Sequence, residues 1–214
     1  MAAVPVKDLE NAKQRLVAVL SREERRALTR TMLEDVLEAL REARLDTVLV
    51  VTRDPEIIAL AHPFPVTIIE EEENRGHTEA VALAQREAAR RQAERFLTIP
   101  GDVPQVTPHE ITALLEAAPP GPSAVFVPSR SGFGTNGALL SPPGVMELKF
   151  GEPSFANHLT AARRKGLDPV VLHLPGLGLD IDSPEDLRAL LQSDGRTRAW
   201  NLLHALGIEA RLGS

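Results

Sequence analysis

Cysteine and tyrosine are both absent from this 214-residue chain, and aromatic residues make up only 3% of it. Without cysteine the chain has no disulfide, no thiolate zinc ligand and no cysteine nucleophile. The shortage of aromatic side chains argues against a base-stacking platform for single-stranded nucleic acid. The lack of cysteine also suits a reducing compartment, and we expect a cytoplasmic protein.

Long apolar runs and an excess of positive charge are missing as well. No apolar run reaches the roughly 18 residues that a membrane-spanning helix needs, and the first residues lack the apolar centre of a signal peptide. The formal net charge is −6, so we expect neither nucleic acid nor a membrane as a partner. Hydrophobic residues make up 43%, which is typical of a globular protein, and we expect a single domain over residues 1–214.

Short β-rich runs alternate with longer helical segments along the chain. Ser21 and Thr107 each begin a capping-box pattern, and Asp54 before Pro55 marks another helix start. The pattern predicts an α/β fold with a mostly parallel central sheet and helices on both faces. The runs that we expect to form strands are 47–52, 66–69, 95–100, 123–128 and 169–174.

Three aspartates follow apolar runs. Asp102 stands in a turn of prolines and glycine after the run 95–100, and Asp180 and Asp182 lie in the apolar run 177–182. If that run is a strand, both side chains point the same way. Ligands of open α/β sheets bind beyond the carboxyl ends of the strands. Three carboxylates without a cysteine or a histidine pair favour Mg²⁺, with Mn²⁺ as an alternative. Asp102 has a second interpretation, as a carboxylate that only bonds amides of its own loop.

Two other segments indicate binding of an anion. The glycine-rich stretch 128–143 contains Thr135 and Asn136, whose side chains and nearby amides suit hydrogen bonding to a ligand, although many such stretches are only hairpin turns. Ser154 is interpreted as the N-cap of a helix that ends at Gly166, with free amides suited to a phosphate or carboxylate. The alternative is a serine that merely caps its helix. We expect His77 and His158 to lie near the site.

A run of cations follows the N-terminal strand. Lys7, Lys13 and Arg15 come after Pro5 in the first loop of the predicted sheet, where cations neutralise a polyphosphate. The other interpretation is a set of solvated helix charges.

Five segments in this order resemble the 2-phospho-L-lactate guanylyltransferase family, which makes the deazaflavin coenzyme F-420. The resemblance covers most of the chain and implies a single Rossmann-like domain of the nucleotide-diphosphosugar-transferase type. The family includes members that act on phosphoenolpyruvate or 3-phospho-D-glycerate. The matching segments read "PVK…AKQRL", "IPGDVP", "GFGTN.ALL", "FGEPSFANH" and "LDIDSPEDL".

The resemblance also implies a role for each candidate residue. Asp102, Asp180 and Asp182 would bind Mg²⁺. Lys13, Arg15 and Asp102 would be the catalytic residues, with Lys13 and Arg15 neutralising pyrophosphate. The residues implied for the phospho-acid are Thr135, Asn136, Gly151 and Ser154, and those implied for GTP are Pro5, Lys7, Lys13, Arg15, Gly76 and Thr78.

The implied reaction transfers GMP from GTP to the phosphate of a small phospho-acid and releases pyrophosphate. We also expect handover of the product to the next enzyme of the pathway, and a monomer or a homodimer. Two alternatives stay open at this point. One is a nucleotidyltransferase with a molybdopterin or sugar-phosphate acceptor, and the other is a non-catalytic GTP-binding α/β module.

Overall fold

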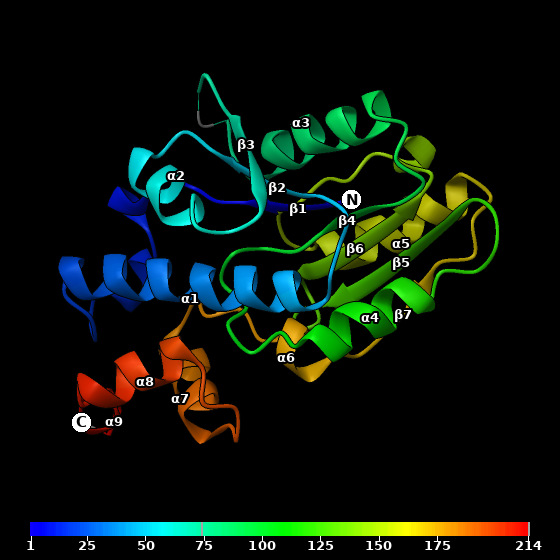
Figure 1. The fold of residues 1–214 in the computed structure, drawn as a ribbon. Helices are drawn as coiled ribbons and strands as arrows, with labels where there is room; N and C mark the ends of the chain where they lie inside the picture. Colours follow the sequence, from blue (N-terminus) through cyan, green and yellow to red (C-terminus); the bar gives the residue numbers. More distant parts are fainter. Residues whose placement is uncertain (74, 214) are drawn as a thin grey trace.

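A seven-stranded sheet forms the centre of the computed structural model, which describes residues 1–73 and 75–213 (Figure 1). Its strand order is β3-β2-β1-β4-β6-β5-β7. Neighbouring strands run parallel except for β6, which is antiparallel to both β4 and β5. The strands are β1 (Ala2–Pro5), β2 (Val48–Thr52), β3 (Val66–Glu70), β4 (Phe96–Thr98), β5 (Ser123–Pro128), β6 (Thr135–Ser141) and β7 (Val170–Val171).

Helices cover both faces of this sheet, as the alternating pattern predicts. On one face α1, α2 and α4 pack on Val4, Val50 and Val125; on the other, α3 and α5 pack on Ala3, Leu49 and other strand residues. Successive strand residues belong to opposite cores because strand side chains alternate in direction. The helices that form these layers are α1 (Arg22–Glu42), α2 (Pro55–Ala61), α3 (His77–Arg90), α4 (Pro108–Glu116), α5 (Ser154–Arg164) and α6 (Pro175–Gly178).

The C-terminal helices rest on α1 rather than on the sheet (Figure 1). They are α7 (Pro184–Gln192), α8 (Arg198–Ala205) and α9 (Ile208–Leu212). A third apolar core joins them to the outer side of α1 and also contains Leu16, Leu20, Leu179 and Ile181. The same core therefore holds the segments on either side of Lys13 and of the Asp180–Asp182 pair. None of the helices in the described part of the chain is long and apolar enough to cross a membrane.

The helix starts predicted from local sequence are confirmed. Ser21 and Thr107 each form a complete capping box, and the carboxylate of Asp54 accepts a hydrogen bond from the Glu56 amide. The structure adds a third capping box at Ser183. Ser154 is different, because it is the first residue of α5 and makes no capping hydrogen bond, while Pro153 holds the N-cap position. The interpretation of Ser154 as an N-cap was wrong. Its hydroxyl instead bonds to the Thr135 hydroxyl.

One other expectation about an element was wrong. The run 177–182 is no strand: it holds the end of α6 and an extended segment without a strand partner. Its apolar residues are buried in the helical cores, which explains the composition. In the glycine-rich stretch 128–143 the alternative interpretation is confirmed in part: residues 129–134 form the turn of a hairpin between β5 and the antiparallel β6, and Thr135–Ser141 is β6 itself.

Candidate active site

The candidate site lies where the strand order reverses. β1 pairs with β2 on one side and with β4 on the other, and such a switch point in an open α/β sheet leaves a crevice beyond the carboxyl ends of the strands. Lys7 and Lys13 follow β1, and Asp102 follows β4. Because β6 runs the opposite way, its first residue, Thr135, lies at the same edge.

Lys13 joins two of the predicted aspartates. Its Nζ lies 2.5 Å from Asp102 Oδ2 and 2.8 Å from Asp182 Oδ1. The lysine side chain is only 7% exposed, against 27% for Asp102 and 45% for Asp182. Burial lowers the pKa of Lys13, but the charges of Asp102 and Asp182 outweigh burial and raise it, so the ammonium stays charged.

The backbone around Lys13 is held in place by a buried arginine. Lys13 has a left-handed conformation, with φ 54°. Arg25 of α1 donates Nε to the carbonyl of Ala12 and Nη1 to the carbonyl of Leu20. These bonds tie both ends of the loop to α1 and aim the Lys13 side chain at the sheet edge. Sequence reasoning missed Arg25, because in the sequence it is one of many charged residues of α1.

The Asp180–Asp182 segment is fixed from two sides. Asn136 Nδ2 lies 3.0 Å from Asp180 Oδ1 and also donates to the carbonyls of Leu177 and Gly178. The amide of Ile181 donates to the carbonyl of Asp102. Asn136, predicted to contact substrate, thus uses its amide nitrogen to hold the aspartate segment.

Asp180 is a half-buried carboxyl group with a raised pKa. Burial raises its pKa, the hydrogen bond from Asn136 opposes this, and the charges of Asp102 and Asp182 raise it further. The three carboxylates are therefore close enough to interact electrostatically, although Asp180 and Asp182 do not lie on a strand. The prediction that the pair points one way rested on a strand that the structure does not have. Leu179 and Ile181, on either side of Asp180, are buried, while both aspartates are half-buried.

The described residues contain no group of three or more acidic or histidine side chains already arranged to hold a metal ion. Instead the Lys13 ammonium lies between Asp102 and Asp182. Within the same residues, however, Asp102 Oδ1 is buried and has no hydrogen-bond partner, and a buried carboxylate oxygen without one is costly. An oxygen-only donor set with one unpaired buried oxygen fits a hard cation such as Mg²⁺.

A second cluster surrounds Thr135. Its Oγ1 lies 2.9 Å from Nδ1 of His158 and 3.3 Å from the hydroxyl of Ser154, and all three residues are buried. Gly151, just before α5, is exposed with φ 109°, a conformation that favours glycine. The structure therefore brings Thr135 and Ser154 together, and His158 lies near the site as expected.

Thr78, predicted to lie near the nucleotide, bonds to the segment before α5. Its hydroxyl accepts from the Phe150 amide at 2.9 Å and donates to the Phe150 carbonyl. Gly76, with φ 93°, is the N-cap of α3. The ring of His77 packs edge-on against Phe150, and burial lowers the pKa of His77 to about 4, with Asp102 opposing and Lys7 adding to the shift.

The remaining predicted residues lie at the end of β1. Pro5 is its last residue and is buried, while Lys7 is exposed. Arg15 is exposed in the short 3-10 helix Gln14–Leu16. These two cations have the solvent access that binding of a polyphosphate requires.

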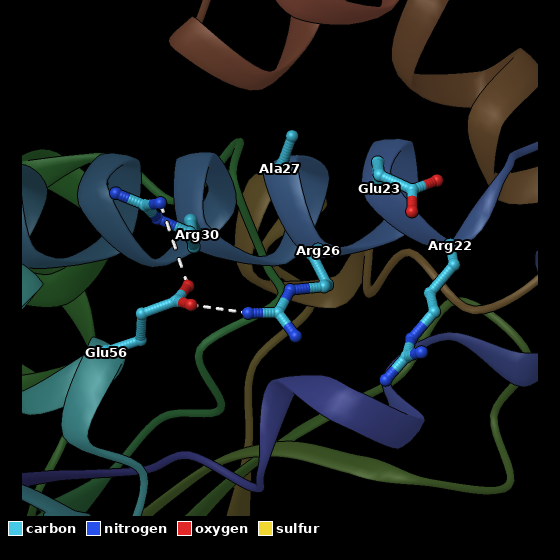
Figure 2. A pocket seen from close by; sticks show the side chains of 6 residues that line it. All are labelled: Arg22, Glu23, Arg26, Ala27, Arg30 and Glu56. Carbon is cyan, nitrogen blue, oxygen red and sulfur yellow. Dashed lines mark hydrogen bonds and ion pairs between the residues drawn. The ribbon is translucent and has the colours of Figure 1, made fainter.

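A cavity of about 460 Å³ lies between α1 and α2 (Figure 2). Arg26 and Arg30 of α1 both pair with Glu56 of α2, and Arg22 pairs with Glu10. Each arginine thus has a carboxylate partner, and the cavity contains none of the predicted site residues.

Comparison with known proteins identifies the family. A family model described as "Guanylyl transferase CofC like" matches residues 1–213. The chain belongs to this family. The expected resemblance is confirmed, and so is the expectation of a nucleotidyltransferase.

Two curated members of the CofC-like family show how far the likeness extends. A phosphoenolpyruvate guanylyltransferase from Rubrobacter xylanophilus is 42% identical, over 91% of this chain and 94% of its own. A 2-phospho-L-lactate guanylyltransferase from Methanobrevibacter ruminantium is 31% identical, over 97% of this chain and 92% of its own. The likeness is therefore not confined to one motif.

Solved structures confirm the fold. A candidate nucleotide-diphospho-sugar transferase from Desulfovibrio desulfuricans G20 aligns with TM-score 0.77 and 18% identity, covering 99% of this chain and 96% of that one. A nucleotidyl transferase from Methanothermobacter aligns with TM-score 0.65 and 15% identity, covering 89% of this chain and 95% of the other. The CofC-like chain thus has the predicted nucleotide-diphosphosugar-transferase fold.

Proposed function

We propose that this CofC-like protein transfers GMP from GTP to the phosphate of a small phospho-acid, in coenzyme F-420 biosynthesis. Phosphoenolpyruvate and 2-phospho-L-lactate are the favoured acceptors, because relatives of both names match nearly the whole chain; 3-phospho-D-glycerate is a third candidate. The observation that carries the proposal is the adjacency of the Lys13–Asp102–Asp182 cluster to the Thr135–Ser154 hydroxyls at one sheet edge.

The chemistry needs little acid–base assistance. A phosphate oxygen of the acceptor attacks the α-phosphorus of GTP, the bond from that phosphorus to the bridging oxygen breaks, and pyrophosphate leaves with the bonding electrons. The nucleophile is already an anion, so the main barrier is bringing two polyanions together. This explains why carboxylates and cations gather at the ends of β1 and β4, where the phosphates would meet.

Each cluster has its own part in this proposal. Lys13, Lys7 and Arg15 supply positive charge near the end of β1, where the triphosphate and the leaving pyrophosphate would lie. Thr135, Ser154 and the amides near Gly151 hold the acceptor. Gly76 and the start of α3 lie beside the nucleoside, while Thr78 acts indirectly by fastening the segment at Phe150.

Mg²⁺, or Mn²⁺ in its place, is the cofactor that we propose. Asp102, Asp180 and Asp182 would hold it. The assignment is supported by Asp102 Oδ1, a buried oxygen that has no hydrogen-bond partner among the described residues and could bind the cation. When bound, the cation neutralises phosphate charge and orients the reacting oxygens. Asn136 holds the carboxylate of Asp180 in place through a hydrogen bond.

One matrix of assays tests the proposal. Purified protein is incubated with Mg²⁺, with GTP, CTP or ATP, and with each of the three phospho-acids, and pyrophosphate is measured. The proposal predicts release with GTP and at least one acceptor, and no release when the acceptor or the divalent cation is omitted. Nucleotide binding without release in any combination would instead favour a non-catalytic module.

A further inference from the structure

His158 lies behind the proposed acceptor site and makes two hydrogen bonds. Its Nε2 lies 3.0 Å from the backbone nitrogen of Lys149, and its Nδ1 lies 2.9 Å from Thr135 Oγ1. The side chain is buried, with the residue 1% exposed. Both of its ring nitrogens are already hydrogen-bonded within the protein, so neither is offered to a ligand, yet one of them contacts the hydroxyl that we assign to the acceptor.

The partners of His158 determine its protonation. A backbone amide can only donate, so Nε2 must accept and carries no proton. In the neutral ring the proton is then on Nδ1, which donates to Thr135 Oγ1. Burial lowers the pKa of His158 to about 4, and the hydrogen bond from Lys149 opposes this only in part, so the ring is neutral near pH 7.

The tautomer of His158 restricts where the hydroxyl proton of Thr135 can point. Both His158 Nδ1 and the Ser154 hydroxyl donate to Thr135 Oγ1, and neither of these groups accepts from it. The Thr135 proton must point away from both, and Thr135 is the first residue of β6, at the site edge.

Aromatic neighbours keep the ring of His158 from turning. It stacks on Phe126 with ring centroids 5.4 Å apart and an interplanar angle of 8°. Phe150 packs edge-on against it at 5.1 Å. A ring flipped by 180° would keep both ring contacts but place carbon atoms where Nδ1 and Nε2 now lie, so both hydrogen bonds would be lost. A ring turned out of its plane would lose the ring contacts as well.

We propose that His158 is a positioning residue: its Nδ1–H tautomer orients the Thr135 hydroxyl proton toward the acceptor's anionic group. His158 does not touch substrate. The proposal rests on the proposed function for the identity of the acceptor, and on hydrogen-bond geometry for the tautomer. It predicts that substitution of His158 weakens binding of the acceptor and leaves binding of GTP unchanged.

Two amide variants separate the bonds of His158. The nitrogen of Asn lies close to the position of Nδ1, so His158→Asn keeps a donor for Thr135 and loses the acceptor for Lys149. A Gln reaches toward the position of Nε2, so His158→Gln keeps the acceptor and loses the donor. We expect His158→Gln to raise KM for the phospho-acid about tenfold, the effect of one hydrogen bond, and His158→Asn to recover most of that loss.

The decisive measurement is a double-mutant cycle with Thr135→Val. If His158 acts through the Thr135 hydroxyl, His158→Gln raises acceptor KM in the wild-type background and has no further effect in Thr135→Val. KM for GTP stays unchanged throughout. Equal effects in both backgrounds, or parallel losses for GTP and acceptor, would overturn the proposal, as would a Gln variant that binds acceptor normally.

A spectroscopic readout keeps the two proposals apart. ¹⁵N NMR of the histidine rings in the unmodified protein should show His158 protonated at Nδ1 and bare at Nε2, identified by comparison with His158→Asn. The opposite tautomer rules out the positioning role whatever the enzyme does. Failure of every acceptor with the wild-type protein, together with the expected tautomer, would count against the proposed function alone.

Discussion

Lys13 forms ion pairs with two of the three aspartates of the candidate site. It lies between Asp102 and Asp182, which are 89 and 169 positions away in sequence. No local pattern could have revealed this pairing, because sequence spacing says nothing about contacts between distant loops. The sequence suggested a lysine facing phosphates; the structure adds that the lysine also holds two carboxylates in place.

Removing the Lys13 charge should destabilise the protein and make it more sensitive to cations. In Lys13→Met, Asp102 and Asp182 lose their shared partner while remaining close, which costs about 1–3 kcal/mol after allowing for their partial exposure. Thermal unfolding with and without MgCl₂ measures both effects. We expect a lower Tm than wild type and a larger rise of Tm with Mg²⁺. Lys165→Met, at an exposed position, is the control, and an identical Mg²⁺ response in all three proteins would contradict the account.

The lowered pKa of His158 predicts that the folded protein becomes less stable as the pH falls. Its pKa is about 4 in the folded protein because of burial, and about 6.5 when unfolded. Between these values the unfolded chain binds a proton that the folded chain does not, so stability decreases as the pH falls from 6.5 to 4. The loss from this ring is roughly 3 kcal/mol at most.

Urea unfolding at pH 7 and pH 4.5 measures this loss. His77, whose pKa is also lowered to about 4, acts in the same direction and remains in His158→Asn. The variant should therefore show a smaller difference between the two pH values than wild type does. An unchanged difference would mean that His158 is not buried in its neutral form.

At the scale of elements, the segment between α6 and α7 depends on one side chain of β6. Asn136 donates to Leu177 and Gly178 carbonyls and to Asp180. Asn136→Ala leaves these acceptors unpaired and should cost about 1–3 kcal/mol. It should also raise the Mg²⁺ concentration needed for half-maximal activity, because Asp180 is no longer held. Asn157→Ala, on the exposed side of α5, should change neither quantity; a normal Mg²⁺ requirement in Asn136→Ala would count against this role.

The elements that the sequence predicted well are those with local signals. Capping boxes at Ser21 and Thr107 and apolar runs such as 123–128 depend on residues only a few positions apart. β6 was missed because its glycine looks like a turn residue. A Cβ at Gly137 would lie 2.9 Å from Leu177 Cδ2 and 3.1 Å from Leu114 Cδ1, so this glycine allows close packing and makes no turn.

Part of the candidate site could also be predicted from the sequence, because its signal is local. Asp102 follows a strand and could be placed from the rule for open α/β sheets, whereas strand alternation does not apply to Asp180 and Asp182, because 177–182 is no strand. The contacts that Asn136, Arg25 and Thr78 make could not be derived, since each joins segments whose register depends on the folded structure.

At the scale of the whole molecule, the C-terminal helices support the site from behind. Asp35 of α1 is buried and accepts hydrogen bonds from the amides of Arg198 and Ala199 at the start of α8. These helices share a core with Leu16 and Ile181, which neighbour the site segments. Docking of the C-terminal helices and order at the site should therefore be coupled.

Asp35→Ala tests this coupling. Loss of both hydrogen bonds at the start of α8 should cost about 1–3 kcal/mol. Hydrogen exchange should accelerate in 198–205 and also in 13–20 and 179–182. Glu42→Ala, at the exposed end of α1, serves as the comparison. Faster exchange confined to α8 would show that the C-terminal helices do not support the site.

The central claim is that the three aspartates and Lys13 form the site of nucleotidyl transfer. The most direct test is pyrophosphate release from GTP and the active phospho-acid, with Mg²⁺, by wild type, Asp102→Asn and Asp182→Asn. Asp168→Asn, an exposed carboxylate before β7, is the matched control. We predict at least a hundredfold lower rate for the first two variants, the order of effect seen when an electrostatic group is removed from a catalytic site, and a wild-type rate for the control. A near wild-type rate in either site variant would contradict the claim.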